Sequence, residues 1–270
     1  METQKAALST GVHIEYSLSG VENEETLLFV HGLGPNLHQF EPQQQFFARN
    51  FRVLSVSLRG HGGSSRPINP TEADYTVQKL ARDVQALLSY LNIEKVHYVG
   101  NSLGGLVGYE LLEADPDRVS SLTTFGTTAE LHSSRFVVWS LLTAIRLLGR
   151  RGMAWLISRT ASEDKAAAAR LGKMYRVVSK DALKLITKNI DDYDYTDIIG
   201  KHDIPMMLVK GGLDREINAN LDSTLEVLSE KSGCRIVELS EVGHFANMEK
   251  PEAFNQVVLD FVVACGTRRN

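Results

Sequence analysis

One serine stands between two glycines directly after a strand-like stretch, and this pattern limits the fold more than any other feature of the chain. Residues 95–99 (KVHYV) are rich in β-branched and aromatic side chains, and Gly100, Ser102 and Gly104 follow them. Glycines at these positions leave room for neighbouring backbone. Residues 103–113 then have the apolar spacing of a helix. The pattern predicts a tight strand-to-helix turn that presents Ser102 as a nucleophile.

A serine among small residues can also be an ordinary helix cap, so the motif alone leaves two interpretations open. A second motif favours the nucleophile. The apolar stretch 26–30 leads directly into residues 31–35 (HGLGP), which could be only a turn but could also present bare backbone N–H groups to an oxyanion. We expect the N–H groups of Leu33 and Leu103 to form this oxyanion hole.

A nucleophilic serine needs a base, and the base needs an orienting acid. Asp214 follows the strand-like residues 205–210, and His244 follows the strand-like residues 234–239. Side chains that follow parallel strands gather at one edge of a sheet. The sequence therefore predicts a catalytic triad of Ser102, Asp214 and His244.

Both partners have structural alternatives. Asp214 could cap a helix, and His244 could be a buried structural histidine. His61 lies in the glycine-rich turn 59–63 (RGHGG), where a structural role is favoured. Five further histidines lie in strand-like or irregular segments without a partner motif: His13, His38, His97, His132 and His202.

Together these motifs resemble the α/β-hydrolase superfamily of serine hydrolases over nearly the whole chain. The resemblance rests on the HG turn at 31–32, the RGHG turn at 59–62, the serine turn at 100–104, the acid loop at Asp214 and the Gly-His pair at 243–244. It implies an α/β fold with a doubly wound, mostly parallel sheet of about eight strands. Apolar strand runs that alternate with amphipathic helices agree with this fold.

The resemblance also implies a division of the chain. Residues 1–128 and 201–270 would form the hydrolase core, and residues 129–200 would form a helical cap over the site. Members of the superfamily commonly carry an aspartate where Ser57 stands. Some members draw the acid from the position of Glu130, which therefore remains an alternative to Asp214.

The stretch 133–188 is largely helical, and its first helix is more apolar than one narrow stripe requires. Such breadth favours burial between two layers over binding at a membrane surface, although Arg146, Arg150 and Arg151 belong to the same helix. One apolar side would then face Ser102, so the substrate is expected to be partly hydrophobic.

Composition argues against nucleic acid as a partner, and the expected partner is a small-molecule substrate, with the oligomeric state left open. The net charge of −4 gives no electrostatic reason to expect nucleic acid. The two cysteines, Cys234 and Cys265, do not suggest a disulfide framework. Residues 1–11 lack the apolar core of a signal peptide, and no stretch of the sequence predicts stable membrane insertion. We expect a cytoplasmic protein that needs no cofactor and no metal.

The expected reaction is hydrolysis of a carboxylic ester or lactone through an acyl-enzyme. Residues 59–122 are similar to the 3-oxoadipate enol-lactonases, whereas residues 100–102 and 249–255 are similar to the meta-cleavage-product hydrolases, which usually carry tryptophan where Phe245 stands. Carbon-carbon bond hydrolysis is therefore the first alternative. A ligand receptor of this fold with slow turnover is the second. Ser102 argues against dehalogenase and epoxide hydrolase chemistry, which uses an aspartate at that position.

Overall fold

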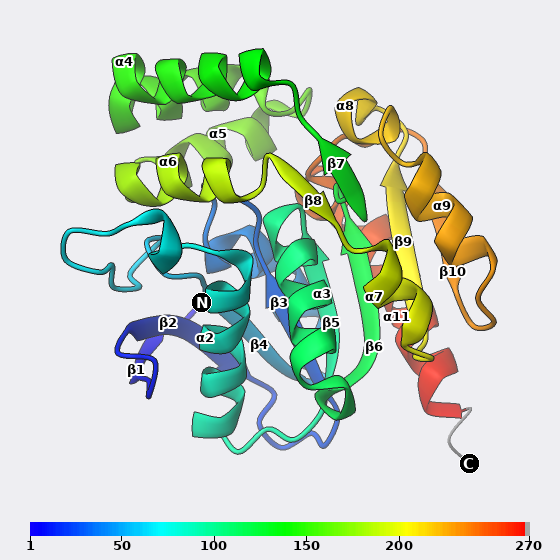
Figure 1. Cartoon of the computed structure of the whole chain (residues 1–270). Coiled ribbons are helices and arrows are strands. Elements are labelled where there is room, and N and C mark those ends of the chain that lie inside the picture. The colour runs from blue at the N-terminus through cyan, green and yellow to red at the C-terminus, as the bar shows by residue number, and fades with distance from the viewer. Residues whose placement is uncertain (268–270) are drawn as a thin grey trace.

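The computed structural model describes residues 1–267, which fold around one eight-stranded sheet (Figure 1). The strand order is β1-β2-β4-β3-β5-β6-β9-β10; β2 pairs antiparallel with β1 and with β4, and the other pairs are parallel. The predicted, mostly parallel α/β sheet is thus confirmed. Its strands are β1 (Gln4–Ala7), β2 (His13–Ser19), β3 (Thr26–Val30), β4 (Arg52–Ser57), β5 (Val96–Asn101), β6 (Val119–Phe125), β9 (Met206–Gly211) and β10 (Arg235–Leu239).

Helices cover both faces of the sheet and the edge at which its parallel strands end. The short 3-10 helices are η1 (Leu37–Phe40), η2 (Glu72–Asp74) and η3 (Pro116–Arg118). The α-helices are α1 (Glu41–Phe47), α2 (Val77–Tyr90), α3 (Leu103–Ala114), α4 (Arg135–Thr160), α5 (Lys165–Tyr175), α6 (Lys180–Asn189), α7 (Thr196–Lys201), α8 (Arg215–Asn218), α9 (Asp222–Ser229), α10 (Ala246–Glu249) and α11 (Pro251–Thr267).

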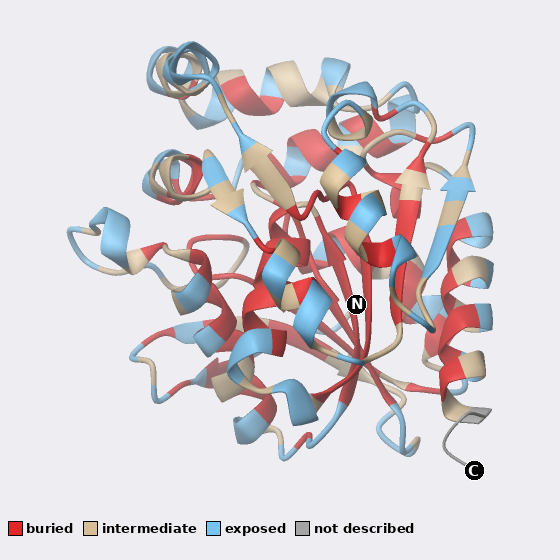
Figure 2. Cartoon of the chain, turned by 45° about the vertical axis from the view of Figure 1, so that its right-hand side comes forward, coloured by how far each residue is buried: buried red, intermediate tan, exposed pale blue. Residues whose placement is uncertain are grey.

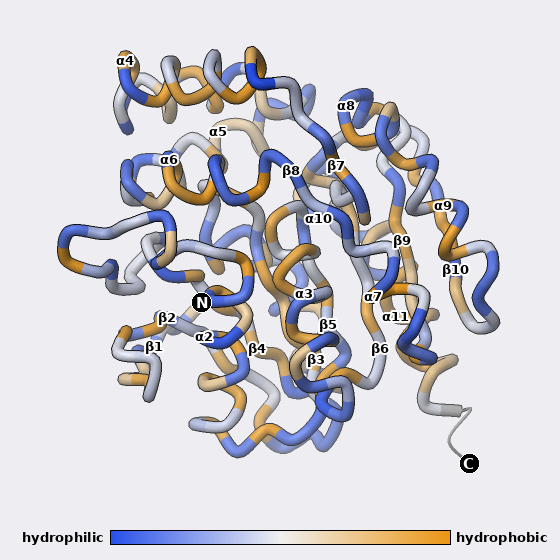
Figure 3. The backbone as a smooth tube through the Cα atoms, in the orientation of Figure 1, coloured by the Kyte–Doolittle hydropathy of each residue, from blue (hydrophilic) through white to orange (hydrophobic). Residues whose placement is uncertain are grey.

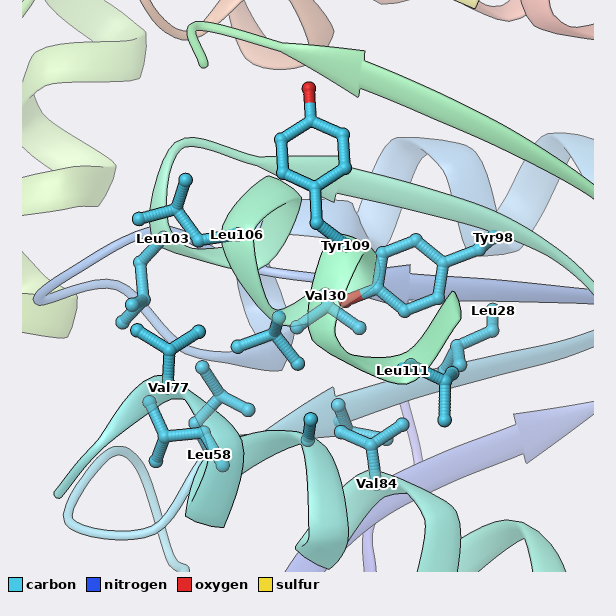
Figure 4. Packing of buried hydrophobic residues seen from close by; sticks show 14 of the residues in the cluster. Leu28, Val30, Leu58, Val77, Val84, Tyr98, Leu103, Leu106, Tyr109 and Leu111 are labelled. Atoms are coloured by element: carbon cyan, nitrogen blue, oxygen red, sulfur yellow. The ribbon is translucent and has the colours of Figure 1, made fainter. Parts of the chain in front are cut away.

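The central strands are apolar on both faces because helices cover both faces. Leu28 and Val30 belong to the same buried cluster as the apolar residues of α2 and α3 (Figure 4). Leu27 and Phe29 point the other way, into the cluster that contains residues of α1 and α11. The buried residues therefore run through the middle of the molecule, along the strands (Figure 2). Packing on both faces positions the strand ends, and the loops that follow them carry the candidate site.

Between β6 and β9 the chain leaves the sheet and builds a layer over the carboxyl ends of its strands (Figure 1). A two-stranded antiparallel ribbon of β7 (Glu130–His132) and β8 (Asp192–Asp194) leads into and out of this layer. Helices α4, α5 and α6 form the rest of it, and we call these three helices the helical layer. The helices agree with the sequence pattern over 133–188, whereas the ribbon was not predicted. The division into a core and a cap at residues 129–200 stays a prediction.

The expectation that the first helix of this stretch is buried between two layers was wrong. Ile145 and Met153 of α4 are buried, but Phe136, Trp139 and Leu147 are exposed on the opposite side. Helices α5 and α6 pack against one side of α4 only (Figures 1 and 3). Hydropathy records how apolar a helix is all round, but not whether a second layer covers it. Within residues 1–267, no helix combines the length and the apolar character needed to cross a membrane.

Candidate active site

Ser102 lies on a strained turn between β5 and α3, as its sequence motif predicts. Its φ of 51° and ψ of −118° are unusual for a residue with a side chain. The turn is closely packed: a Cβ atom at Gly100 would lie 2.4 Å from the Gly104 carbonyl oxygen, and one at Gly104 would lie 2.1 Å from the Val30 carbonyl oxygen. The Ser102 hydroxyl makes no capping hydrogen bond to α3. It is therefore not the helix-capping serine of the alternative interpretation.

The structure brings Asp214 and His244 together on adjacent loops. His244 Nδ1 and Asp214 Oδ2 lie 2.8 Å apart, and the Asp214 side chain is 8% exposed compared with 27% for His244. The Leu213 N–H donates to the Val242 carbonyl over 2.9 Å and so ties the acid loop to the base loop. An acid that accepts from Nδ1–H leaves Nε2 free to act as a base.

Ser102, Asp214 and His244 line one cavity of about 500 Å³, and Leu33 and Leu103 line it too. A cavity of this size fits a small-molecule ligand. Residues 1–267 contain no hydrogen bond between the Ser102 hydroxyl and the His244 imidazole. Such contacts often tighten only when substrate binds, so the arrangement is compatible with proton transfer in the complex.

Glu130, the alternative acid, lies beside another histidine. Its Oε1 is 2.9 Å from His132 Nε2, and Asp192 Oδ1 is 2.6 Å from His132 Nδ1. These carboxylates, Asp192 first, raise the pKa of His132. The three side chains link β7 to β8. The geometry therefore pairs Asp214 with His244, and Glu130 with His132.

The loop after β3 lies against the serine turn. A Cβ atom at Gly32 would lie 3.2 Å from Ser102 Cβ, so a larger residue would press on the Ser102 side chain. The Tyr175 hydroxyl, from α5, donates to the Leu33 carbonyl over 2.6 Å and fixes the orientation of this loop. Within residues 1–267, neither the Leu33 N–H nor the Leu103 N–H donates to a protein acceptor. Both donors are thus available to an oxyanion in the cavity.

Two buried histidines, His31 and His61, form hydrogen bonds that support the loop after β3. His61 Nε2 accepts from the Gly34 N–H over 3.2 Å, and the other ring nitrogen contacts the Arg59 carbonyl at 3.1 Å. His31 Nε2 accepts from the Leu58 N–H over 3.0 Å. Acceptance at Nε2 requires the neutral imidazole. Burial lowers the pKa of His61 to about 4 and holds the pKa of His31 well below its usual value. Both rings therefore support the loop, as the sequence indicated for His61.

Comparison of the sequence with known proteins identifies the family of this chain. A sequence profile of the alpha/beta hydrolase fold matches residues 25–172, more than half of the chain. The chain belongs to the α/β-hydrolase fold family. It is 26% identical to 3-oxoadipate enol-lactonase 2 of Acinetobacter baylyi, over 92% of each chain. It is 27% identical to the 2-hydroxy-6-oxononadienedioate/2-hydroxy-6-oxononatrienedioate hydrolase of Paraburkholderia xenovorans, over 93% of this chain and 91% of that protein.

Solved structures show the same relationship for this α/β hydrolase. The enol-lactonase from Burkholderia xenovorans LB400 superposes with a TM-score of 0.85 at 26% identity, over 96% of this chain and all of that one. Both kinds of relative suggested by the sequence motifs, the enol-lactonases and the meta-cleavage-product hydrolases, are thus found among the matches.

A buried amide network joins the serine turn of this α/β hydrolase to the loop of His244, and sequence reasoning missed it. Asn101 Nδ2 donates to the His244 carbonyl over 3.1 Å, and Gln39 Nε2 donates to Asn101 Oδ1 over 2.9 Å. Asn247 Nδ2 donates in turn to the Gln39 carbonyl over 3.1 Å. All three side-chain amides are fully buried, so water cannot reach them, and these hydrogen bonds satisfy polar groups that would otherwise be unpaired. No local sequence pattern predicts such a network, because its members come from distant parts of the chain.

Glu15 contacts the turn that carries the unusual Ser57. The Ser57 hydroxyl donates to Glu15 Oε2 over 2.7 Å, and the Gly63 N–H donates to the same oxygen over 2.7 Å. A carboxylate from β2 therefore reaches the place where superfamily members commonly carry an aspartate. The departure at Ser57 changes local bonding and leaves the pair of Asp214 and His244 intact.

Acid should destabilise this α/β hydrolase through its buried histidines. The unfolded chain protonates His61 near pH 6.5, whereas the folded chain does so only near pH 4. Between these values the unfolded state binds more protons, so the free energy of unfolding falls as the pH falls. From pH 7.5 to 5, His61 should account for about 2 kcal/mol of this loss. Urea unfolding of the native protein and of His61→Gln at both pH values measures it. Parallel pH profiles for the two proteins would contradict the expectation.

Proposed function

We propose that this α/β hydrolase cleaves neutral, largely apolar carboxylic esters or lactones through an acyl-enzyme. The observation that carries the proposal is the composition of one cavity. It is lined by Ser102, by the hydrogen-bonded pair of Asp214 and His244 and by the two loops with free N–H groups, and its lining includes no lysine and no arginine among residues 1–267.

In the first half of the reaction, Ser102 Oγ attacks the acyl carbonyl carbon while His244 Nε2 takes the hydroxyl proton. Asp214 holds the imidazole in the required tautomer and stabilises its positive charge. The N–H groups of Leu33 and Leu103 bind the oxyanion. When the tetrahedral intermediate collapses, the bond to the leaving oxygen breaks and His244 gives that oxygen its proton.

In the second half, water completes the cycle. His244 Nε2 removes a proton from water, whose oxygen attacks the acyl carbon of the ester on Ser102. The same two N–H groups bind the second oxyanion. Breaking the bond to Ser102 Oγ returns the proton to the serine and releases a carboxylic acid. Every proton and electron pair is thus accounted for by these side chains and water.

The charge of the cavity favours a neutral substrate. Val138, Leu141 and Ile145 of α4 supply apolar lining, whereas Asp191 and Glu216 are acidic. A substrate carboxylate would lose water there without gaining a cationic partner. The Paraburkholderia relative is named for a dienedioate, which is a dicarboxylate. Carbon-carbon hydrolysis of such a dianion is therefore less well supported here than ester or lactone hydrolysis.

A matched pair of esters tests the proposal. We expect kcat/KM for p-nitrophenyl hexanoate to exceed that for the mono-p-nitrophenyl ester of adipic acid by at least about 100-fold, because the second ester differs only by a terminal carboxylate with no cationic partner. Steady-state release of p-nitrophenol measures both. A small neutral lactone and a ring-fission dienoate complete the panel.

The other outcomes separate the alternatives. Equal or better turnover of the adipate ester would overturn the selectivity argument. Preference for the dienoate would favour carbon-carbon hydrolysis. A single turnover, followed by a stable complex with raised thermal stability, would favour the receptor.

A further inference from the structure

Both tryptophans of the chain belong to α4, which bends at Gly149 (φ 57°, ψ −171°), so Trp139 lies before the bend and Trp155 after it. We call the exposed side chains of α4 that do not line the cavity its outer side. Trp139 is 62% exposed and Trp155 is 57% exposed. Phe136, which is 73% exposed, stacks on Trp139 with ring centroids 6.2 Å apart, and Leu147 is 76% exposed. Large apolar side chains are thus exposed on both parts of α4, and such exposure on a protein surface marks an interaction site.

The same helix is strongly basic. Residues 135–188 contain twelve Lys and Arg and only three Asp and Glu, although the whole chain has 29 of the former and 33 of the latter. Helix α4 has no acidic residue, and among residues 1–267 no carboxylate forms an ion pair with its arginines. These five exposed arginines are Arg135, Arg146, Arg150, Arg151 and Arg159.

We propose that the outer side of α4 docks on an anionic lipid surface. Aromatic and aliphatic side chains insert at the boundary between headgroups and acyl chains, and arginines bind the lipid phosphates. The hydropathy of α4 fits this location because hydrophobic and hydrophilic residues alternate along the helix (Figure 3), and all its charged residues are arginines. The guanidinium of Arg159 lies 4.4 Å from the Trp155 ring centroid, so the two types of contact are adjacent.

Charge also argues against a second copy of this chain as the occupant. A symmetric contact through α4 would place the five arginines of one helix against the five of the other. Like charges brought together in this way oppose association. An anionic lipid surface satisfies the arginines and the aromatic rings at once.

Docking would place α4 between the lipid and the catalytic cavity. The inner side of α4 supplies Val138, Leu141 and Ile145 to that cavity, while the outer side carries the tryptophans. The docking proposal rests on the outer side alone and is tested by binding, so it stands or fails independently of the proposed hydrolysis.

Vesicle binding tests the proposal with the native full chain. We expect the protein to sediment with phosphatidylglycerol/phosphatidylcholine vesicles and to remain in solution with phosphatidylcholine vesicles. Binding should weaken as salt is raised, because the attraction is electrostatic. Tryptophan emission should shift to shorter wavelength on binding. Since Trp139 and Trp155 are the only tryptophans in the chain, this signal reports on α4 alone.

Charge variants locate the surface. The triple variant Arg146→Gln, Arg150→Gln, Arg151→Gln should bind the anionic vesicles on the order of 100-fold more weakly, at about 1 kcal/mol for each arginine. A matched variant removes three exposed arginines of the core, with Arg49→Gln, Arg66→Gln and Arg82→Gln, and should bind as the native protein does. Far-UV circular dichroism checks that both variants are folded.

Three results would overturn the proposal. One is equal binding to neutral and anionic vesicles. Another is native-like binding by the folded triple variant of α4. The third is a stable dimer in sedimentation velocity whose tryptophan emission is already shifted without lipid, which would make a second copy the occupant.

Discussion

Replacing Ser102 with alanine is expected to lower kcat for p-nitrophenyl hexanoate by about 10⁴- to 10⁶-fold. The variant loses the oxygen that would form the acyl-enzyme, while the N–H groups of Leu33 and Leu103 remain and leave a small residual rate. Binding of the ester should change little, because the cavity lining is otherwise intact. Steady-state kinetics measures the loss. Labelling by a fluorophosphonate, followed by mass spectrometry, should occur in the native protein and not in the variant.

A second serine in the same cavity provides the control. Ser133 lines the cavity but lies outside the strained turn, so Ser133→Ala should keep near-native turnover and near-native labelling. Alanine at position 102 keeps the backbone of the turn, and the thermal stability of that variant should stay close to native. Undiminished turnover by well-folded Ser102→Ala would remove this serine from the mechanism. A comparable loss in both variants would point to damage to the cavity instead.

The sequence predicted the sheet well because its central strands are buried on both faces. The apolar stretch 26–30 forms β3 with the same limits, and the strand-like residues 205–210 contain most of β9. Short, continuous apolar runs between turn residues are typical of strands that are buried on both faces of a sheet. The serine turn was predictable for a related reason: the approach of Gly100 to the Gly104 carbonyl oxygen is a local steric demand that glycine meets.

Other features depend on contacts that no local pattern encodes. The strands β7 and β8 have three residues each, and their charged side chains do not suggest a strand. Tyr175 contacts the Leu33 carbonyl across 142 residues of sequence. Whether the apolar side chains of α4 are exposed depends on which other elements pack against this helix, and the sequence of α4 does not determine that. Sequence reasoning therefore found the residues that could react, whereas the contacts that orient them required the fold.

Asp214→Asn is expected to lower kcat by roughly 10⁴-fold. An amide that turns its NH₂ group toward His244 Nδ1 becomes the donor, and the proton of the neutral ring moves to Nε2. The ring nitrogen that should remove the proton of Ser102 is then no longer a base. The amide also lacks the negative charge that stabilises the imidazolium. Steady-state hydrolysis of p-nitrophenyl hexanoate measures the effect.

Glu130→Gln is the matched comparison, because it makes the same change of charge and shape at the alternative acid. Glu130 contacts the exposed His132, so turnover in this variant should stay close to native.

The thermal stability of Asp214→Asn distinguishes a catalytic role of Asp214 from a helix-capping role. Asp214 precedes α8, but its side chain makes no capping hydrogen bond there and contacts His244 instead. Asp214→Asn should therefore lose turnover with little change in Tm, whereas a cap would lose stability first. A severe loss of turnover in Glu130→Gln, with native-like turnover in Asp214→Asn, would reverse the assignment of the acid.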